Sequence, residues 1–129
     1  MLDTHIITVT TYNIHKAHSV MRVCHLSTLK QGLHELNADI VCLQEVQDIN
    51  TKRKLRSLES HGDSQVRALQ GQDYPYIAYG ANAVYHHGNH GNAILSKHPI
   101  QKWSNIDVSD HRLEQRGILH ATVQHPQYG

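Results

Sequence analysis

The sequence predicts one α/β domain with several strands and few helices. Two observations carry this prediction: a strand, a helix and a second strand follow one another with short joints in the first 47 residues, and further strand-like segments follow residue 74. A strand–helix–strand unit places its two strands parallel in one sheet. A chain of 129 residues is also long enough for a single domain with its own core.

The first unit is read from hydrophobic pattern. Residues 5–14, "HIITVTTYNI", combine Ile, Val, Thr and Tyr without a helix- or strand-breaking residue, which favours a strand. Leucines then recur at steps of three and four, which predicts a helix ending near Asn37. These leucines are Leu26, Leu29, Leu33 and Leu36. Residues 39–46, "DIVCLQEV", are expected to form the second strand.

The remaining segments alternate between polar and strand-like composition. Residues 47–73 are polar and charged, although Val66 and Leu69 suit one short helix. The glycine-punctuated stretch 81–91, "ANAVYHHGNHG", predicts a loop. Three further strands are expected at 74–80 ("YPYIAYG"), at 92–100 ("NAILSKHPI", ended by Pro99) and at 116–123 ("RGILHATV").

Composition limits the classes of function. Twelve Lys and Arg against 11 Asp and Glu give a formal net charge of +1, so no strong general attraction to nucleic acid or membrane follows. The two cysteines, Cys24 and Cys42, lie in apolar surroundings without metal-like spacing. They are expected to be reduced thiols, which suits a cytoplasmic location. No signal peptide or transmembrane segment is visible.

The ends of the first two predicted strands carry polar side chains. The first strand ends at Asn13 and the second at Glu45. Because parallel strands place their carboxyl ends at one edge of a sheet, the amide and the carboxylate should lie together. Mg²⁺ binds few carboxylates and keeps several waters, which leaves room for phosphate oxygens. From spacing alone, ordinary solvated strand ends are the better explanation of these residues, because polar residues end most strands.

Five segments in order resemble one protein family. The segments "TYNIHK", "ADIVCLQEVQ", "YGANAVY", "HGNAILSKHPI" and "EQRGILH" cover nearly the whole chain. They are similar to the endonuclease/exonuclease/phosphatase family of metal-dependent phosphodiesterases and phosphomonoesterases, including DNase I-like nucleases, and most of all to its small bacterial branch. The resemblance implies the N-terminal half of a DNase I-like four-layer α/β sandwich, with a mixed sheet and flanking helices.

The resemblance also assigns residues. Glu45 corresponds to the Mg²⁺-binding glutamate of the family, and Asn13 corresponds to the asparagine that closes the first strand in the metal and phosphate site. Both are therefore candidate catalytic and metal-binding residues, for Mg²⁺ or alternatively Mn²⁺. The implied reaction is in-line attack of water on phosphorus, with the metal neutralising charge on the phosphoryl group.

Three further residues are candidates for binding substrate phosphate. Arg116 corresponds to a basic residue that contacts phosphate in some members, and a guanidinium suits phosphate oxygens; a salt bridge to Glu114 is the alternative. Asn92 corresponds to a substrate-facing residue at the start of a strand, or else caps a turn. His15 either lines the edge of the site or is an ordinary surface histidine.

The second half of the family's site is not recognisable in the sequence. It comprises a histidine, an Asp-x-Asn motif and a closing Asp-His pair, and the stretch Ser109-Asp110-His111 reads as a loop instead. Residues 1–129 are therefore expected to be a partial domain truncated at its C-terminus, with little hydrolysis alone. The expected partners are a phosphoester substrate (nucleic acid, phospholipid or small phosphate ester) and the missing C-terminal half.

Two alternatives remain open. A non-catalytic remnant could bind phosphate or nucleic acid through Arg116 and a basic cluster at 52–56 that contains Lys52, Arg53, Lys54 and Arg56. The 13 histidines could instead form a Zn²⁺ or Ni²⁺ site. The histidines considered for such a site are His86, His87 and His90, with His61 or His98.

Overall fold

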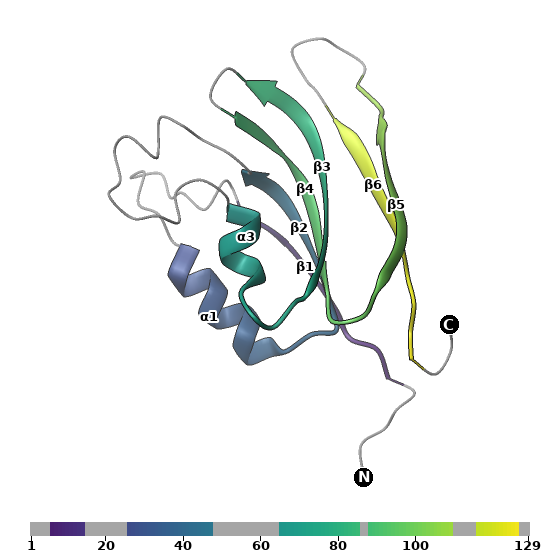
Figure 1. The fold of residues 1–129 in the computed structure, drawn as a ribbon. Coiled ribbons are helices and arrows are strands. Elements are labelled where there is room, and N and C mark those ends of the chain that lie inside the picture. Colours follow the sequence, from purple (N-terminus) through teal and green to yellow (C-terminus); the bar gives the residue numbers. More distant parts are fainter. Residues whose placement is uncertain (1–5, 15–25, 48–64, 86–87, 110–115, 127–129) are drawn as a thin grey trace.

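The computed structural model describes residues 6–14, 26–47, 65–85, 88–109 and 116–126. These residues form two helices and six strands (Figure 1). In chain order the elements are β1 (Val9–Asn13), α1 (Leu26–Leu36), β2 (Ile40–Gln47), α3 (Gln65–Gln70), β3 (Tyr76–Tyr85), β4 (Gly88–Ser96), β5 (Ile100–Asp107) and β6 (Gly117–Val123).

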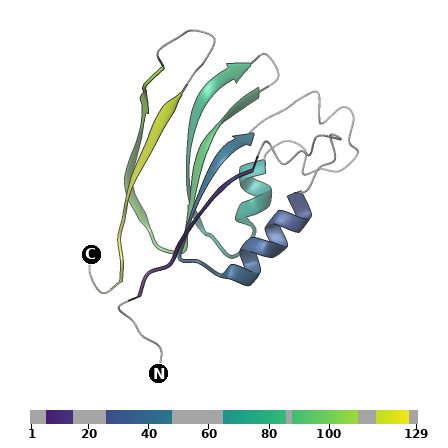
Figure 2. The same cartoon turned by 180° about the vertical axis from the view of Figure 1, so that it is seen from behind.

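The strands form two sheets. The larger has the order β1-β2-β4-β3, in which β1 runs parallel to β2 and the other neighbours are antiparallel, so the sheet is mixed. The smaller is the antiparallel pair β5-β6. Figures 1 and 2 show α1 and α3 on one face of the larger sheet and the β5-β6 pair on the other. The predicted α/β class and mixed sheet are confirmed.

The main core lies between the helices and the larger sheet. Val41, Leu43 and Val46 of β2 have no exposed surface, and Leu33 of α1 packs against the same cluster. Leu26 and Leu29 are partly buried beside it, so these three leucines of the predicted stripe face the sheet, whereas Leu36 at the end of the helix is exposed. Burying a Val or Leu side chain contributes about 1.5–3 kcal/mol, which makes this interface the main source of stability in the described fold.

The helix α1 ends where the sequence predicted. Asn37 follows its last residue with a φ of 51°, and the Asn37 backbone N–H donates to the Leu33 carbonyl at 3.0 Å. A left-handed residue just after a helix satisfies carbonyls that would otherwise lack partners, and Asn tolerates this conformation better than most residues.

The loop predicted at 81–91 is wrong. β3 continues to Tyr85 and β4 begins at Gly88, and the two strands are paired as far as these two residues. The glycines and asparagines there favour turns locally, but pairing along the whole of β4 determines the structure. A register shift between Ala81 and Ala83 accommodates the irregular composition.

The strand β5 was not predicted. Its larger apolar residues, Ile100, Trp103 and Ile106, are spaced by three rather than alternating, and a register shift follows Ile100. Most of the strand is exposed, so the buried face that normally generates an alternating pattern is narrow. β5 is therefore specified by its pairing with β6 more than by its own sequence.

The acidic residue at the start of β2 joins that strand to β1. Asp39 Oδ2 accepts hydrogen bonds from the Thr8 backbone N–H at 2.9 Å and from its hydroxyl at 3.2 Å. The bond from the Thr8 backbone lowers the pKa of Asp39 below its usual value, and smaller contributions from the Thr8 hydroxyl and His98 act in the same direction. Partial burial opposes the shift.

This depressed pKa predicts a specific loss of stability in acid. The folded pKa of Asp39 lies below the unfolded one. The contribution of Asp39 to the free energy of unfolding is therefore complete above pH ~4 and disappears as the pH falls through the folded pKa. Solvent screening limits the effect to about 1 kcal/mol or less. Between pH 6 and pH 3, the free energy of unfolding measured in urea should fall less for Asp39→Asn than for wild type. Equal decreases in the two proteins would contradict this prediction.

Candidate functional site

Asn13 and Glu45 lie at the same edge of the larger sheet. Asn13 pairs with Gln44 in the parallel ladder, and the Ile14 backbone N–H continues it by donating to the Gln44 carbonyl at 3.0 Å. Glu45 is therefore the next residue along β2 from the partner of Asn13. The Asn13 side chain is exposed and Glu45 is half-buried. The structure thus places the two predicted residues on adjacent strands, with Asn13 at the end of β1 and Glu45 two residues before the end of β2, which continues past the predicted strand end.

Glu45 has an unusual backbone conformation. Its φ is 56°, in the left-handed region, and the register of β2 against β4 shifts between Leu43 and Val46. For a residue that is neither Gly, Asn nor Asp, this conformation costs roughly 1–2 kcal/mol. A β-bulge redirects a side chain and is common beside active sites. The surrounding structure therefore holds the carboxylate in a direction that a regular strand would not give it.

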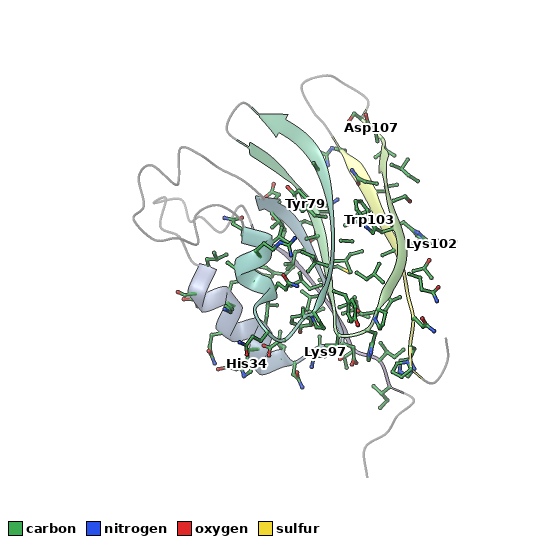
Figure 3. All side chains as sticks on the ribbon, in the orientation of Figure 1. His34, Tyr79, Lys97, Lys102, Trp103 and Asp107 are labelled. Atoms are coloured by element: carbon green, nitrogen blue, oxygen red, sulfur yellow. The ribbon has the colours of Figure 1, made fainter. Side chains whose placement is uncertain are left out.

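Buried contacts on both sides hold this bulge. Leu43 and Val46 flank it and are fully buried, and the Tyr79 hydroxyl of β3 donates to the Val46 carbonyl at 3.0 Å. Figure 3 shows Tyr79 on the helix side of the sheet. The Gln44 side chain donates from Nε2 to the Thr11 hydroxyl at 3.0 Å and so ties the ends of β1 and β2 together. Sequence reasoning did not give Tyr79 or Gln44 these positioning roles.

Removing the Tyr79 hydroxyl should weaken this support. Tyr79→Phe leaves the carbonyl of the fully buried Val46 without that donor, and we expect the free energy of unfolding to fall by about 1–3 kcal/mol. Tyr76→Phe, at an exposed tyrosine of the same strand, should change it by less than about 0.5 kcal/mol. Urea unfolding of the two variants measures the difference, and equal effects would rule out the proposed support.

Asn92 lies in the interior of β4 rather than at the start of a strand or in a turn. β4 begins at Gly88, so neither predicted setting for Asn92 is correct. Its half-buried side chain donates from Nδ2 to the Gly117 carbonyl of β6 at 3.2 Å. Asn92 therefore links the two sheets, close to the start of β6.

Arg116 immediately precedes β6, and backbone contacts fix its position. Its N–H donates to the Ser109 hydroxyl oxygen at 2.8 Å, and its carbonyl accepts from the Val108 N–H at 3.0 Å. Ser109 also donates its N–H to Asp107 Oδ1 at 2.9 Å. The Ser109 side-chain and backbone hydrogen bonds lower the pKa of Asp107. Because Asn92 contacts Gly117, this exposed arginine is adjacent to the point where the sheets are joined.

Several candidates lie outside the described residues. Among the predicted phosphate ligands this applies to His15, and it also applies to the possible salt-bridge partner Glu114. The other candidates outside the described residues are the basic cluster at 52–56, Asp110, His111, His61, His86, His87 and Cys24. His98 is described, at the opposite end of β2 from Glu45, where its Nε2 lies 3.5 Å from Asp39 and its ring centre 5.4 Å from that of His125.

The available donors match a hard cation better than a soft one. Glu45 and Asn13 offer oxygen ligands, which suit a Mg²⁺ ion that keeps waters for its remaining positions. Within the described ranges, no three His, Cys, Asp or Glu side chains form a group that could hold a metal. The part of the chain that the structure describes thus provides two adjacent oxygen donors and no complete metal shell.

Two properties bear on the compartment predicted from the sequence. Cys42 has a free thiol, and burial raises the pKa of that thiol. In the residues that the structure describes, no helix is long and apolar enough to cross a membrane.

Comparisons with known proteins identify the family. Residues 10–125 match the model of the Endonuclease/Exonuclease/phosphatase family. Uncharacterized protein YbhP of Escherichia coli K12 is 38% identical over 122 residues, which are 94% of this chain and 48% of YbhP; YbhP of Shigella flexneri gives the same values. The chain therefore spans about half the length of the curated relatives it matches.

Two solved structures share the fold. The endonuclease/exonuclease/phosphatase family protein from Leptotrichia buccalis C-1013-b has a TM-score of 0.67 at 17% identity, covering 94% of this chain and 51% of that one. The endonuclease/exonuclease/phosphatase from Beutenbergia cavernae has a TM-score of 0.71 at 22% identity, covering 95% of this chain and 36% of that one. These two likenesses show the fold, and the match over residues 10–125 shows that the chain belongs to the endonuclease/exonuclease/phosphatase family.

Proposed function

We propose that this chain carries part of the site of a Mg²⁺-dependent phosphoester hydrolase, with Glu45 and Asn13 as metal ligands. The observation that carries the proposal is the left-handed bulge at Glu45, adjacent to the strand end that bears Asn13. A strained backbone costs stability, whereas a fixed direction for a carboxylate serves metal binding.

The chain's own contribution is to position oxygen donors. The bulge is held by Leu43, Val46 and the Tyr79 hydroxyl, so the Glu45 backbone is set before any ligand binds. Such preorganisation avoids reordering the site when the ligand arrives. Bound Mg²⁺, or alternatively Mn²⁺, would supply positive charge to neutralise a phosphoryl group.

Arg116 is the proposed phosphate contact. Its side chain is exposed, and the bonds to Ser109 and Val108 fix the backbone from which it extends. A guanidinium can donate two parallel hydrogen bonds to phosphate oxygens. Members of the family generally act on phosphoesters, and we propose the phosphoester group itself, whether in nucleic acid, phospholipid or a small ester, as the feature recognised. A cytoplasmic location, expected from the cysteines, stays a prediction.

We also propose that residues 1–129 hydrolyse phosphoesters slowly or not at all by themselves. The described residues offer two oxygen donors but no cluster of three or more metal-ligating side chains. The chain as a whole also spans only about half the length of the curated relatives it matches. Mg²⁺ binding without efficient water activation is the behaviour expected from such a partial site.

The test separates binding from hydrolysis. Mg²⁺ should raise the melting temperature of wild type, because a ligand that binds only the folded state stabilises it, and Glu45→Gln should lose that increase. Glu35→Gln, the same charge change at an exposed position of α1, should retain it. Bis(p-nitrophenyl) phosphate should be hydrolysed at close to the uncatalysed rate. An unchanged Mg²⁺ response in Glu45→Gln would contradict the metal site, and rapid Mg²⁺-dependent hydrolysis would contradict the partial-site proposal.

A further inference from the structure

Asn92 of β4 lies opposite the bulge that contains Glu45. The register of β2 against β4 shifts between Leu43 and Val46, whose partners are the two chain neighbours of Asn92. Two residues of β2, Gln44 and Glu45, therefore stand opposite one residue of β4, as in other β-bulges. Asn92 is thus the residue of β4 that the ladder places across from the proposed metal ligand Glu45.

The row that contains Asn92 also contains Asn13, and it lies on the face of the larger sheet that is turned toward the second sheet. Asn13 pairs with Gln44 on one side of the bulge, and Asn92 pairs with Gly80 on the other. A Cβ added at Gly80 would collide with the Asn105 side chain of β5, so this face of β3 packs against β5. Figures 1 and 2 show the β5-β6 pair on this side and the helices on the opposite side.

The Asn92 amide reaches across to the residue that follows Arg116. Its Nδ2 donates to the Gly117 carbonyl of β6 at 3.2 Å. The Arg116 backbone is otherwise tied to the end of β5, through the Ser109 hydroxyl and the Val108 N–H. Those bonds fix Arg116 within its own pair of strands. The bond from Asn92 fixes the same point relative to the larger sheet.

We propose that Asn92 is a positioning residue that couples phosphate binding at Arg116 to metal binding at Glu45. The inference rests on the proposed function, in which one phosphoester group contacts both the metal and the guanidinium. Two contacts to one group reinforce each other only when their separation is fixed before the group binds. A single side chain fixes it here, because Asn92 stands opposite the Glu45 bulge and holds the backbone next to Arg116.

Asn105 provides a matched control for this role. Its Nδ2 donates to the Ala81 carbonyl at 3.2 Å, so it also joins the two sheets through an asparagine amide, from β5 to β3. Both asparagines are half-buried. The partner of Asn105 in the ladder with β6 is Leu119, and its amide bond is made to β3, so removing that bond leaves the link between Asn92 and Gly117 in place. Asn92→Ala and Asn105→Ala therefore remove equivalent bonds, of which one adjoins Arg116.

The experiment measures how strongly the 129-residue chain binds dimethyl phosphate, a simple phosphodiester, with and without saturating Mg²⁺. The amide signals of Arg116 and Gly117 in nuclear magnetic resonance spectra report the binding. Mg²⁺ should raise the affinity of wild type at least about fivefold, and that of Asn92→Ala less than about twofold. Asn105→Ala should keep the wild-type increase. Without Mg²⁺ all three proteins should bind dimethyl phosphate equally, because each retains the Arg116 guanidinium.

A second variant at the same position makes the result independent of one substitution. Asn92→Ser keeps a polar side chain that is too short to reach the Gly117 carbonyl, and it should lose the effect of Mg²⁺ as Asn92→Ala does. Urea unfolding of each variant shows that it is folded. Because a merely structural bond would affect stability alone, the Mg²⁺-dependent change in affinity is the measurement that identifies positioning.

The outcomes distinguish this inference from the function on which it rests. An effect of Mg²⁺ that persists in Asn92→Ala and Asn92→Ser, or that Asn105→Ala loses equally, would overturn the inference and leave the proposed function standing. Weaker binding by Asn92→Ala in the absence of Mg²⁺ would also overturn it, because Asn92 would then contact phosphate directly. No effect of Mg²⁺ on wild type would contradict the proposed function, and the inference with it.

Discussion

Gly80→Ala is expected to destabilise the chain by about 1–3 kcal/mol, at the upper end of what a single added methyl group usually costs. A Cβ at Gly80 would lie 2.5 Å from Cγ and Oδ1 of Asn105 and 2.9 Å from its Cβ. Atoms that close cannot coexist, so one sheet would have to move relative to the other. The Asn105 side chain cannot simply withdraw, because its Nδ2 donates to the Ala81 carbonyl at 3.2 Å.

The matched control is Gly32→Ala in α1. No atom lies within 4 Å of a Cβ placed at Gly32, and alanine is favoured over glycine inside a helix by about 0.5–1 kcal/mol. The two substitutions should therefore shift the urea midpoint in opposite directions. A Gly80→Ala variant as stable as wild type would mean that β3 and β5 are not packed as closely as described.

Glu45→Gly is expected to raise the free energy of unfolding by about 1 kcal/mol while abolishing the response to Mg²⁺. Glycine adopts a φ of 56° without steric cost, so the backbone strain at the bulge disappears. The carboxylate disappears with it. A residue whose removal stabilises the fold but eliminates ligand binding is kept for function and not for packing.

Two comparison variants separate strain from charge. Glu45→Gln keeps a side chain in the strained conformation, so it should lose the Mg²⁺ response without the full gain in stability. Asn37→Gly, at the other non-glycine residue with a positive φ in the described ranges, should stabilise the chain slightly and leave the Mg²⁺ response intact. If Glu45→Gly destabilises the chain, the bulge is not a strained conformation and the argument for it fails.

The hydrophobic pattern of the sequence was sufficient to predict the elements that bury one clear face. The leucine stripe located α1 and its end at Asn37, and the apolar run of β2 located the central strand. The hydrophobic pattern failed to predict elements whose structure is decided by pairing with another strand. β5 is mostly exposed and has no alternating apolar face, and the hairpin of β3 and β4 runs through residues that favour turns locally.

For the candidate site, the sequence predicted adjacency but not geometry. Parallel pairing of β1 and β2 places Asn13 beside Gln44 and Glu45, as the strand–helix–strand order implied. The positive φ of Glu45 could not be read from sequence, since no glycine or asparagine marks the bulge. The Tyr79 bond to Val46 depends on the registers of β3 against β4 and of β4 against β2, which the composition of the separate strands does not specify.

The central claim, that Glu45 and Asn13 bind a divalent cation, is tested most directly by nuclear magnetic resonance with Mn²⁺ as a paramagnetic probe. Substoichiometric Mn²⁺ should broaden the amide signals of Asn13, Gln44 and Glu45 first, excess Mg²⁺ should restore them, and Glu45→Gln should show no selective broadening. Broadening centred instead on Asp39, His98 and His125, or the same broadening in wild type and Glu45→Gln, would contradict the account.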